Sequence, residues 1–294
     1  MANEKCEKDA SCQSCDSASQ CSQAQKEAHD QELIERKMQN IKYSFMVISG
    51  KGGVGKSSVA VNLAATLSQQ GAEVGILDAD IHGPNIPKML GVEDKKPLAV
   101  DEGILPIAVT DKLRVMSIAF FLQQSQDAVI WRGPLKHSLI KQFLGEVQWG
   151  KLDYLIIDLP PGTGDEALST AHLIKKVSGA LVVTTPQDVA LLDSRKSITF
   201  CREIKVPLIG VVENMSGMLC PHCNKVIDLF KTGGGERIAG EMKVPFLGRI
   251  PLDPQMVIST DDGTPFVLQH PESAVAKAFE AVAKKWRSYL EGAA

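Results

Sequence analysis

The sequence predicts an α/β protein whose mostly parallel sheet is covered by helices on both faces. From about residue 43 onward, short runs of β-branched and aliphatic residues alternate with longer helical stretches. Most of the short runs are apolar throughout, as strands buried on both faces of a parallel sheet are. In addition, the glycine-rich stretch SGKGGVGKSS at 49–58 directly follows the first apolar run. Glycines at this point predict a tight loop between a strand and a helix.

The predicted elements follow one another in a regular order. Strands are expected at 44–49, 73–78, 113–118, 154–158, 180–185, 208–212 and 246–250, and helices at 57–70, 135–146, 165–177, 189–204 and 233–242. A last amphipathic stretch places five apolar side chains on one helical face, namely Val275, Phe279, Val282, Trp286 and Leu290. Its lysines leave a membrane-surface helix open, but we favour a terminal helix docked on the sheet.

Length and composition are those of an ordinary globular chain. The 294 residues are 44% hydrophobic and 23% charged, which suits one large domain or two small ones. The formal net charge of -3 gives no basic field that would attract nucleic acid or anionic lipid. The N-terminus lacks the apolar core of a signal peptide, and no apolar run approaches the length of a membrane span. We therefore expect a cytoplasmic protein that binds neither nucleic acid nor membranes.

Three segments are expected along the chain. Residues 1–24 are polar and carry four cysteines, so they form no hydrophobic core and are disordered unless a metal orders them. Residues 25–42 are rich in helix formers and suit a helical linker. Residues 43–294 hold the alternating elements and form the main domain. Because thiols stay reduced in the cytoplasm, the seven cysteines are expected to be metal ligands or packed core residues.

The stretch at 49–58 satisfies the pattern of a phosphate-binding loop, in the strand-loop-helix context that such a loop needs. Its glycines let backbone N–H groups turn toward phosphate oxygens, Lys56 reaches the β and γ phosphates, and the Ser57 hydroxyl is placed to bind Mg²⁺. An incidental glycine-rich turn is the alternative. The expected nucleotide contacts in the loop are Gly50, Lys51, Gly52, Gly53, Val54, Gly55, Lys56, Ser57 and Ser58.

Lys51 is a second lysine, placed just after the first glycine of the loop. The sequence GKGGVGKS resembles the deviant phosphate loop of the P-loop ATPase family that includes the Mrp and ApbC proteins, MinD and the ParA partition ATPases. In that family the early lysine reaches the nucleotide bound by a partner subunit, which implies a homodimer. Lys51 would then supply positive charge in trans to phosphoryl transfer. A solvated loop lysine is the alternative interpretation.

Carboxylates follow two of the predicted strands. Asp158 ends the run YLIID and is placed to hold Mg²⁺ through water, while Asp78 and Asp80 end the second strand at the same edge of the sheet. Gly162 and Gly164 form a loop that could sense the γ phosphate. By the resemblance, Asp80 orients the attacking water, and turn or N-cap aspartates are the alternative. The expected catalytic residues are Lys51, Lys56, Asp80 and Asp158.

The same resemblance identifies the side of the site that would hold the base. The stretch ENMSG at 213–217 is similar to the family's adenine-contacting segment, with the asparagine at Asn214, and it lacks the Asn-Lys-x-Asp signature of GTPases. ATP is therefore the expected nucleotide. Gln187 in TTPQD, together with Pro251 and Asp253 in IPLD, resembles further family features on this side.

Cys220 and Cys223 form a C-x2-C pair, whose spacing lets two thiolates bind one metal centre. Because two ligands are not four, two copies of the chain would complete a four-thiolate site. The CPHC motif together with GKGGVGKS resembles the Mrp/ApbC-like iron-sulfur carriers, including the eukaryotic cytosolic nucleotide-binding scaffold proteins, over about residues 43–290. This resemblance implies a 4Fe-4S cluster held between subunits. A structural zinc knuckle and a thioredoxin-like redox pair are the alternatives.

The N-terminal cysteines extend the resemblance. Cys12, Cys15 and Cys21 are spaced as in the tail that carries a second cluster in the scaffold proteins, and Cys6 is the expected fourth ligand although it lies closer than their first cysteine does. A zinc site is the alternative for this tail. Cys201, on a predicted helix, is expected to be a buried core thiol.

These features predict an ATP-binding and hydrolysing carrier that assembles a labile iron-sulfur cluster at a dimer interface and transfers it to apo-proteins. The expected cofactors are ATP, Mg²⁺ and a 4Fe-4S cluster, and the expected partners are a second copy of the chain and recipient apo-proteins. Two other classes stay open. They are a MinD- or ParA-like positioning ATPase and a zinc-stabilised, nucleotide-dependent regulatory protein.

Overall fold

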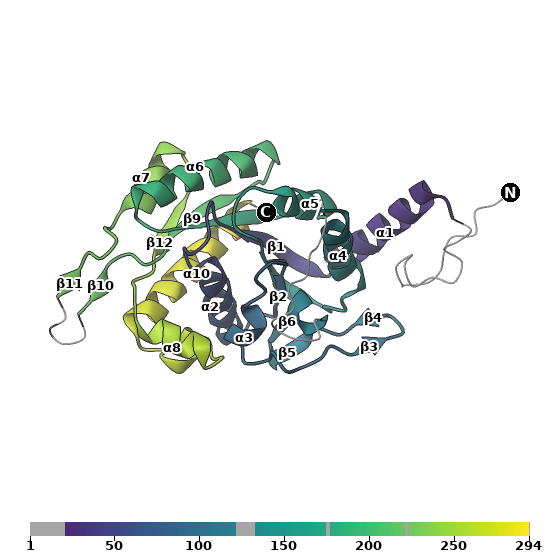
Figure 1. Cartoon of the computed structure of the whole chain (residues 1–294), viewed down its shortest axis with the longest axis horizontal. Helices are drawn as coiled ribbons and strands as arrows, with labels where there is room; N and C mark the ends of the chain where they lie inside the picture. Colours follow the sequence, from purple (N-terminus) through teal and green to yellow (C-terminus); the bar gives the residue numbers. More distant parts are fainter. Residues whose placement is uncertain (1–20, 122–132, 175–176, 221–222, 224, 294) are drawn as a thin grey trace.

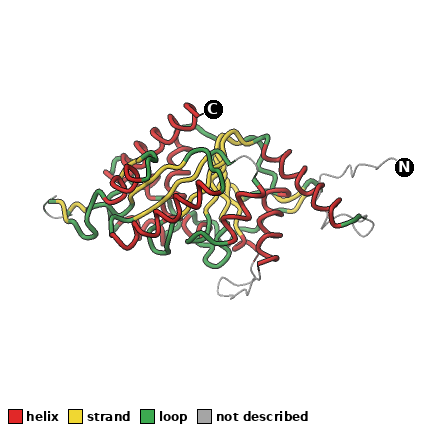
Figure 2. The backbone as a smooth tube through the Cα atoms, turned by 90° about the horizontal axis from the view of Figure 1, so that it is seen from above, coloured by secondary structure: helices red, strands yellow, loops and turns green. Residues whose placement is uncertain are grey.

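The computed structural model describes residues 21–121, 133–174, 177–220, 223 and 225–293 (Figures 1 and 2). The helices are α1 (Gln23–Met38), α2 (Lys56–Gln69), α3 (Ile86–Met89), α4 (Gly133–Glu146), α5 (Asp165–Leu173), α6 (Asp188–Glu203), α7 (Gly234–Glu241), α8 (Gln255–Asp261), α9 (Phe266–Gln269) and α10 (Ala274–Ala293), with a 3-10 turn at Ile118–Phe121. The strands are β1 (Ile41–Ile48), β2 (Val74–Asp78), β3 (Ala99–Val100), β4 (Gly103–Ile104), β5 (Ile107–Thr110), β6 (Leu113–Ser117), β7 (Leu152–Asp158), β8 (Gly179–Thr184), β9 (Ile209–Glu213), β10 (Met218–Leu219), β11 (Val226–Ile227) and β12 (Phe246–Arg249).

One sheet organises the described part of the chain, with the strand order β12-β9-β8-β1-β7-β2-β6-β5. Its neighbouring strands run parallel except for β5, which pairs antiparallel with β6. Asp78 at the end of β2 lies opposite Asp158 of β7 on one side and opposite Ser117 of β6 on the other. The carboxyl ends of the parallel strands therefore meet at one edge, where ligands of such sheets bind.

Helices cover both faces of the sheet, with α2 and α10 on one face and α4, α5, α6 and α7 on the other (Figures 1 and 2). This arrangement confirms the predicted fold class. The five-residue stripe of the last helix is buried, and the Trp286 ring meets Phe45 of β1 edge to face at 5.4 Å between ring centroids. The favoured docking of this helix on the sheet is thus confirmed. Among the described residues, no helix is both long and apolar enough to cross a bilayer.

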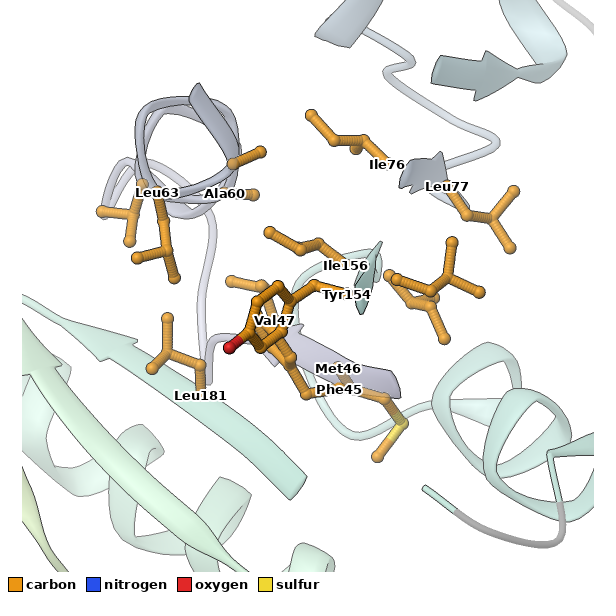
Figure 3. Close-up of a cluster of buried hydrophobic side chains, with 14 of the residues drawn as sticks. Phe45, Met46, Val47, Ala60, Leu63, Ile76, Leu77, Tyr154, Ile156 and Leu181 are labelled. Atoms are coloured by element: carbon orange, nitrogen blue, oxygen red, sulfur yellow. The ribbon is translucent and has the colours of Figure 1, made fainter. Parts of the chain in front are cut away.

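The core lies between β1 and the helices on either side of it (Figure 3). Phe45, Met46 and Val47 of β1 are completely buried, because the strand is central in the sheet and has helices over both faces. Leu63 of α2 and Ile156 of β7 belong to the same cluster. An apolar run with no polar alternation is what such a strand requires. The rigid core places the loop after β1 at a fixed position on the sheet edge.

α1 begins at Gln23, two residues before the segment predicted as a helical linker, and β1 begins inside that segment. α1 starts at a capping box, in which Ser22 and Gln25 exchange side-chain to backbone hydrogen bonds. It ends at Met38, and Ile41 already pairs with Leu152 of β7. β1 is therefore three residues longer at its start than the strand expected at 44–49.

α1 does not stand apart from the rest of the chain. Its Leu33 and Ile34 side chains are buried, and Lys141 of α4 lies 2.7 Å from Asp30 of α1 between Nζ and Oδ2. The sparse apolar positions of this helix therefore serve as packing contacts on α4.

Several short elements were not predicted. These are α3, α8 and α9, the edge strand β5, and the two-residue strands of the β3–β4 and β10–β11 hairpins. Their lengths of two to seven residues are too short to show a hydrophobic period. The predicted helix at 165–177 is described to Leu173 only. The other predicted strands and helices occur with ends shifted by one or two residues.

Candidate functional site

The phosphate-binding loop connects the end of β1 to the start of α2. Gly55 has a φ of 79°, and a Cβ at this position would come within 2.3 Å of Nδ2 of Asn214. A Cβ at Gly50 would come within 2.3 Å of the backbone of Asp193 in α6. Glycine is therefore required at both ends of the loop. The N-terminus of α2 opens into this turn, where backbone N–H groups attract anions.

A buried cation and a buried anion meet at the start of α2. Nζ of Lys56 lies 2.7 Å from Oδ1 of Asp158, and the Ser57 hydroxyl donates to Oδ2 of the same carboxylate at 2.6 Å. The side chains of Lys56 and Asp158 are 6% and 0% exposed. Burial raises the pKa of Asp158, and the neighbouring Lys56 and Ser57 act in the opposite direction. The ammonium, the hydroxyl and the carboxylate are the groups that a phosphate and a divalent cation need.

Asp78 is a second buried carboxyl group beside this cluster. Its Oδ2 accepts a hydrogen bond from the Ser117 hydroxyl at 2.9 Å, and its Oδ1 accepts from the Asp80 backbone N–H at 3.2 Å. Burial, followed by the nearby Asp158 carboxylate, raises the pKa of Asp78 to about 8. We therefore expect Asp78 to hold a proton at neutral pH in the folded, metal-free chain.

Replacing Asp78 with asparagine is expected to stabilise the metal-free protein above pH 5. In the unfolded chain the aspartate ionises near pH 3.8, whereas in the folded chain it ionises near pH 8. Between these values the folded state binds the extra proton, so its stability falls as the pH rises. Asparagine removes this penalty, which is on the order of a few kcal/mol at pH 8. Thermal unfolding from pH 5 to 8 in EDTA measures the effect.

The control for this measurement is Asp101→Asn, because Asp101 is exposed between β3 and β4. Its pH profile is expected to follow that of the wild type. An Asp78→Asn profile that also falls as steeply as the wild type would show that Asp78 is ionised in the folded protein at neutral pH.

Asp80 follows β2 and is half-buried at the same edge of the sheet. Its Oδ1 accepts a hydrogen bond from the Gly83 backbone at 3.3 Å, which orders the turn after β2. The Gly162 backbone N–H donates to the carbonyl of Ser49 at 2.7 Å, so the loop after β7 lies against the phosphate-binding loop. Lys51 is half-buried in that loop. The structure thus brings the predicted catalytic residues to one edge, from the ends of β1, β2 and β7.

Asn214 connects the end of β9 to the phosphate-binding loop. Its side chain is buried, and Nδ2 donates to the carbonyl of Val54 at 2.9 Å. The 250–253 loop lies beside it, because the Ser216 N–H donates to the Ile250 carbonyl at 3.0 Å. Pro251 and Asp253 of this loop are half-buried, as is Gln187 at the start of α6. Asn214 and the 250–253 loop, both expected around the base, are therefore adjacent.

The cysteine pair lies on a hairpin that projects from the body of the molecule at β10 and β11 (Figure 1). The Cys220 N–H donates to the Lys225 carbonyl at 2.9 Å, which closes the hairpin. Cys220 is half-buried and Cys223 is exposed. Within the described ranges, no three Cys, His, Asp or Glu side chains lie close enough together to hold one metal ion. The pair would therefore need further ligands from outside this part of the chain.

The structure describes two of the other five cysteines, Cys21 and Cys201. Cys6, Cys12 and Cys15 lie outside the described residues. Cys21 is half-buried just before α1. Cys201 is completely buried in α6, where burial raises the pKa of its thiol to about 12. A thiol that stays protonated in the core is neither a metal ligand nor a nucleophile, as expected for this residue.

Comparison with models of protein families identifies the family of this chain. The model described as NUBPL iron-transfer P-loop NTPase matches residues 40–287. The chain belongs to this family. The match spans both GKGGVGKS and CPHC and confirms the resemblance drawn from these motifs.

Two relatives of this P-loop NTPase match it over most of its length. A protein of Methanocaldococcus jannaschii, named an iron-sulfur cluster carrier protein, is 48% identical over 285 residues, which is 97% of this chain and 98% of the relative. A Trichoplax adhaerens protein, named a cytosolic Fe-S cluster assembly factor NUBP2 homolog, is 50% identical over 246 residues, with 82% of this chain and 93% of the relative covered.

Solved structures share the fold of this P-loop NTPase. A nucleotide-binding protein of Archaeoglobus fulgidus, in complex with ADP and with cobalt found, is 40% identical, with a TM-score of 0.72 over 80% of this chain and 92% of that one. The cell division ATPase MinD of Pyrococcus furiosus is 27% identical, with a TM-score of 0.64 over 84% of this chain and 99% of that one.

Sequence reasoning did not identify three residues that pack around this P-loop NTPase site without belonging to its predicted binding or catalytic set. Ser117 holds Asp78, the Asp193 backbone packs on Gly50, and Glu213 precedes Asn214 with a completely buried side chain. Ser117 and Glu213 each end a parallel strand, so their position at the carboxyl edge is a signal that could have found them. The contact of the Asp193 backbone with Gly50 depends on how α6 packs, and no sequence pattern predicts it.

Proposed function

We propose that the chain is an ATP-dependent carrier of iron-sulfur clusters, with the 49–58 loop as the ATP site and Cys220 and Cys223 as the ligands of the transferred cluster. The observation that carries this proposal is the attachment of the cysteine hairpin to the nucleotide side. Asn214 binds the phosphate loop, and Gly217, three residues further on, accepts from the Leu252 N–H at 2.8 Å. The names of the Methanocaldococcus and Trichoplax relatives support the cargo, and the Trichoplax name supports a cytoplasmic location.

The nucleotide half of the site is built to hold Mg²⁺-ATP. Lys56 is positioned to contact the phosphates, and Ser57 and Asp158 present oxygens for Mg²⁺, directly or through water. Bound Mg²⁺ would neutralise charge on the phosphates. The remaining loop residues supply backbone N–H groups, while Asn214, Pro251 and Asp253 line the side proposed for adenine.

Hydrolysis is assigned to the half-buried Asp80 and to Lys51. Asp80 lies at the end of β2 and would orient the attacking water, whereas Lys51 of one subunit would contact the nucleotide of a partner. A dimer would also supply the two further metal ligands that the hairpin of a single chain lacks. Two copies of the pair supply four thiolates, the usual number for a 4Fe-4S cluster. The exposure of Cys223 leaves its thiol accessible to a second chain and to a recipient apo-protein.

Replacing Asp80 with alanine is expected to leave ATP binding within about fivefold of the wild type and to lower the hydrolysis rate by about a hundredfold or more. The substitution removes the group that orients water and leaves the phosphate loop in place. Steady-state phosphate release and calorimetric titration with a non-hydrolysable ATP analogue measure the two quantities separately. Asp111→Ala, at an exposed aspartate in the turn between β5 and β6, is the matched control. Equal loss of binding and hydrolysis would remove Asp80 from this role.

Anaerobic purification with iron and sulfide analysis tests the proposed cargo. The wild type is compared with Cys220→Ala/Cys223→Ala and with a variant that has alanine at Cys6, Cys12, Cys15 and Cys21. Iron and sulfide that are lost from the hairpin variant, with broad visible absorption in the wild type, support the proposal. Zinc without sulfide in the wild type would replace it with a zinc-stabilised regulatory protein.

A further inference from the structure

Glu213 carries a completely buried carboxylate at the end of β9, next to Asn214. Its Oε1 accepts from the Gly233 N–H at 2.9 Å, and its Oε2 accepts from the Gly235 N–H. The Ser216 hydroxyl donates to Oε1 as well, and Nε of Arg249 lies 3.5 Å from it. A buried charge is costly unless donors surround it. The four donor groups around Glu213 therefore indicate that the fold specifically accommodates a carboxylate at this position.

The partners of this carboxylate belong to the segment that begins α7. The run Gly233, Gly234 and Gly235 turns into the helix, with Gly233 in the left-handed region at a φ of 83°. A Cβ at Gly235 would lie 2.9 Å from Cβ of Glu213. The glycines therefore let the positive end of α7 close on the Glu213 side chain, which acts as an internal anion at a helix N-terminus.

Glu213 thereby fixes both ends of one loop. The chain leaves the sheet at Glu213, runs through the β10–β11 hairpin with the cysteine pair, and returns at Gly233. Another tie near the return is the ion pair between Lys231 and Asp188, 3.0 Å between Nζ and Oδ2. Both of these side chains are more than 60% exposed, and an exposed pair of this kind contributes little stability. The buried tie is the one made by Glu213.

The same loop is attached to the nucleotide side directly beyond Glu213. Asn214 donates to the carbonyl of Val54 in the phosphate loop, and Gly217 accepts from the N–H of Leu252. Met218 of β10 then forms an isolated bridge with Leu252. A shift of the phosphate loop or of the 250–253 loop would therefore be transmitted to the base of the hairpin, provided that this base is held as one unit.

We propose that Glu213 is a positioning residue that clasps the two ends of the 214–232 segment and thereby couples the nucleotide loop to the cysteine pair. This inference rests on the proposed function for its biological meaning. The coupling depends on the negative charge, because the Gly233, Gly235, Ser216 and Arg249 groups around the carboxylate are all donors. In Glu213→Gln the shape is kept, but the amide NH2 would face one of these N–H groups and the clasp would loosen.

The test measures the alkylation rate of Cys220 by iodoacetamide in the full-length, reduced chain freed of iron and zinc, with and without Mg²⁺-ADP. Cys220 is suited to this because it is half-buried, and Cys21 in the same molecule is the internal reference. In the wild type, ADP is expected to change the Cys220 rate by at least about fivefold. In Glu213→Gln the rate without ADP is expected to rise, and the response to ADP to fall below about twofold, while ADP affinity stays within about fivefold.

The matched control is Glu236→Gln. Glu236 lies in the first turn of α7, and its exposed carboxylate contacts the same Arg249 as Glu213 does. This variant is expected to behave as the wild type. A lower melting temperature alone would not change the response to ADP, so the response separates coupling from general stability. If Glu213→Gln does not fold, Ser216→Ala removes one donor and keeps the charge, and it is expected to weaken the response partially.

The proposal is overturned if folded Glu213→Gln keeps the wild-type alkylation rate and its response to ADP. It is overturned as well if ADP does not change the alkylation rate of Cys220 in the wild type. It is also overturned if Glu236→Gln loses the response equally. Iron analysis of the wild type tests the proposed cargo separately. A chain that binds ADP but no iron at Cys220 and Cys223 defeats the proposed cargo, while the alkylation rates still decide the role of Glu213.

Discussion

Replacing Lys56 with alanine is expected to abolish measurable binding of ATP and ADP. The Lys56 ammonium is 6% exposed and is held 2.7 Å from Asp158 at the mouth of the phosphate loop. Loss of a buried charged donor to phosphate removes about 3 kcal/mol, which weakens binding by at least about a hundredfold. The chain is still expected to fold, because Ser57 continues to donate to Asp158, and loss of the Lys56 charge would raise the pKa of Asp158 further and let its carboxyl group take up a proton. Calorimetric titration with Mg²⁺-ADP measures the loss.

The other lysine of the loop is the control for this prediction. Lys51 is half-buried, and in the proposed function it contacts the nucleotide of a partner subunit. Lys51→Ala is therefore expected to keep ADP affinity within about fivefold and to lower ATP hydrolysis. Wild-type affinity in a folded Lys56→Ala protein would remove the 49–58 loop from nucleotide binding. Equal loss in both variants would show that the two lysines share one role.

The fold could be predicted because its central strands have a distinctive composition. A run such as Phe45 to Ile48 is buried on both faces of a parallel sheet, and its sequence is accordingly apolar without alternation. The edge strand β5 was not predicted, since only Ile107 of its four residues is buried. The last helix was assigned to the sheet by its stripe, and the packing of Trp286 on Phe45 confirms this.

The site could be predicted only as far as its residues stand in motifs. GKGGVGKS marks Lys56 and Ser57, and YLIID marks Asp158, but neither motif shows that the three side chains contact one another. Contacts such as that of Gly50 with the α6 backbone arise from residues more than a hundred positions apart. The clasp of Glu213 was also missed, because its partners Gly233 and Gly235 follow 20 and 22 residues later and no local pattern connects them with Glu213.

The hairpin cysteines rather than the tail cysteines are expected to donate the transferable cluster. Cys220 and Cys223 offer two thiolates per chain, and Cys223 is exposed, so in the proposed function a cluster there would be shared between subunits and open to exchange. The hairpin site and the tail site are both loaded with iron-sulfur clusters, and an apo-ferredoxin-type acceptor is added. The absorbance of the acceptor then measures the transfer of a cluster. Cys220→Ala/Cys223→Ala is expected to lose transfer, about tenfold or more, and dilution of the wild type below its dimer dissociation constant is expected to release the same cluster.

The matched variant for this experiment replaces Cys6, Cys12, Cys15 and Cys21 with alanine in the full-length chain. Substitution is preferable to truncation at residue 24, because Ser22 caps α1 and the helix packs its Leu33 and Ile34 into the protein. A tail site draws its ligands from one chain, so a cluster bound there is expected to survive dilution and to stay behind during transfer. Transfer that persists without Cys220 and Cys223 but vanishes without the tail cysteines would reverse the assignment and make the N-terminal segment the donor.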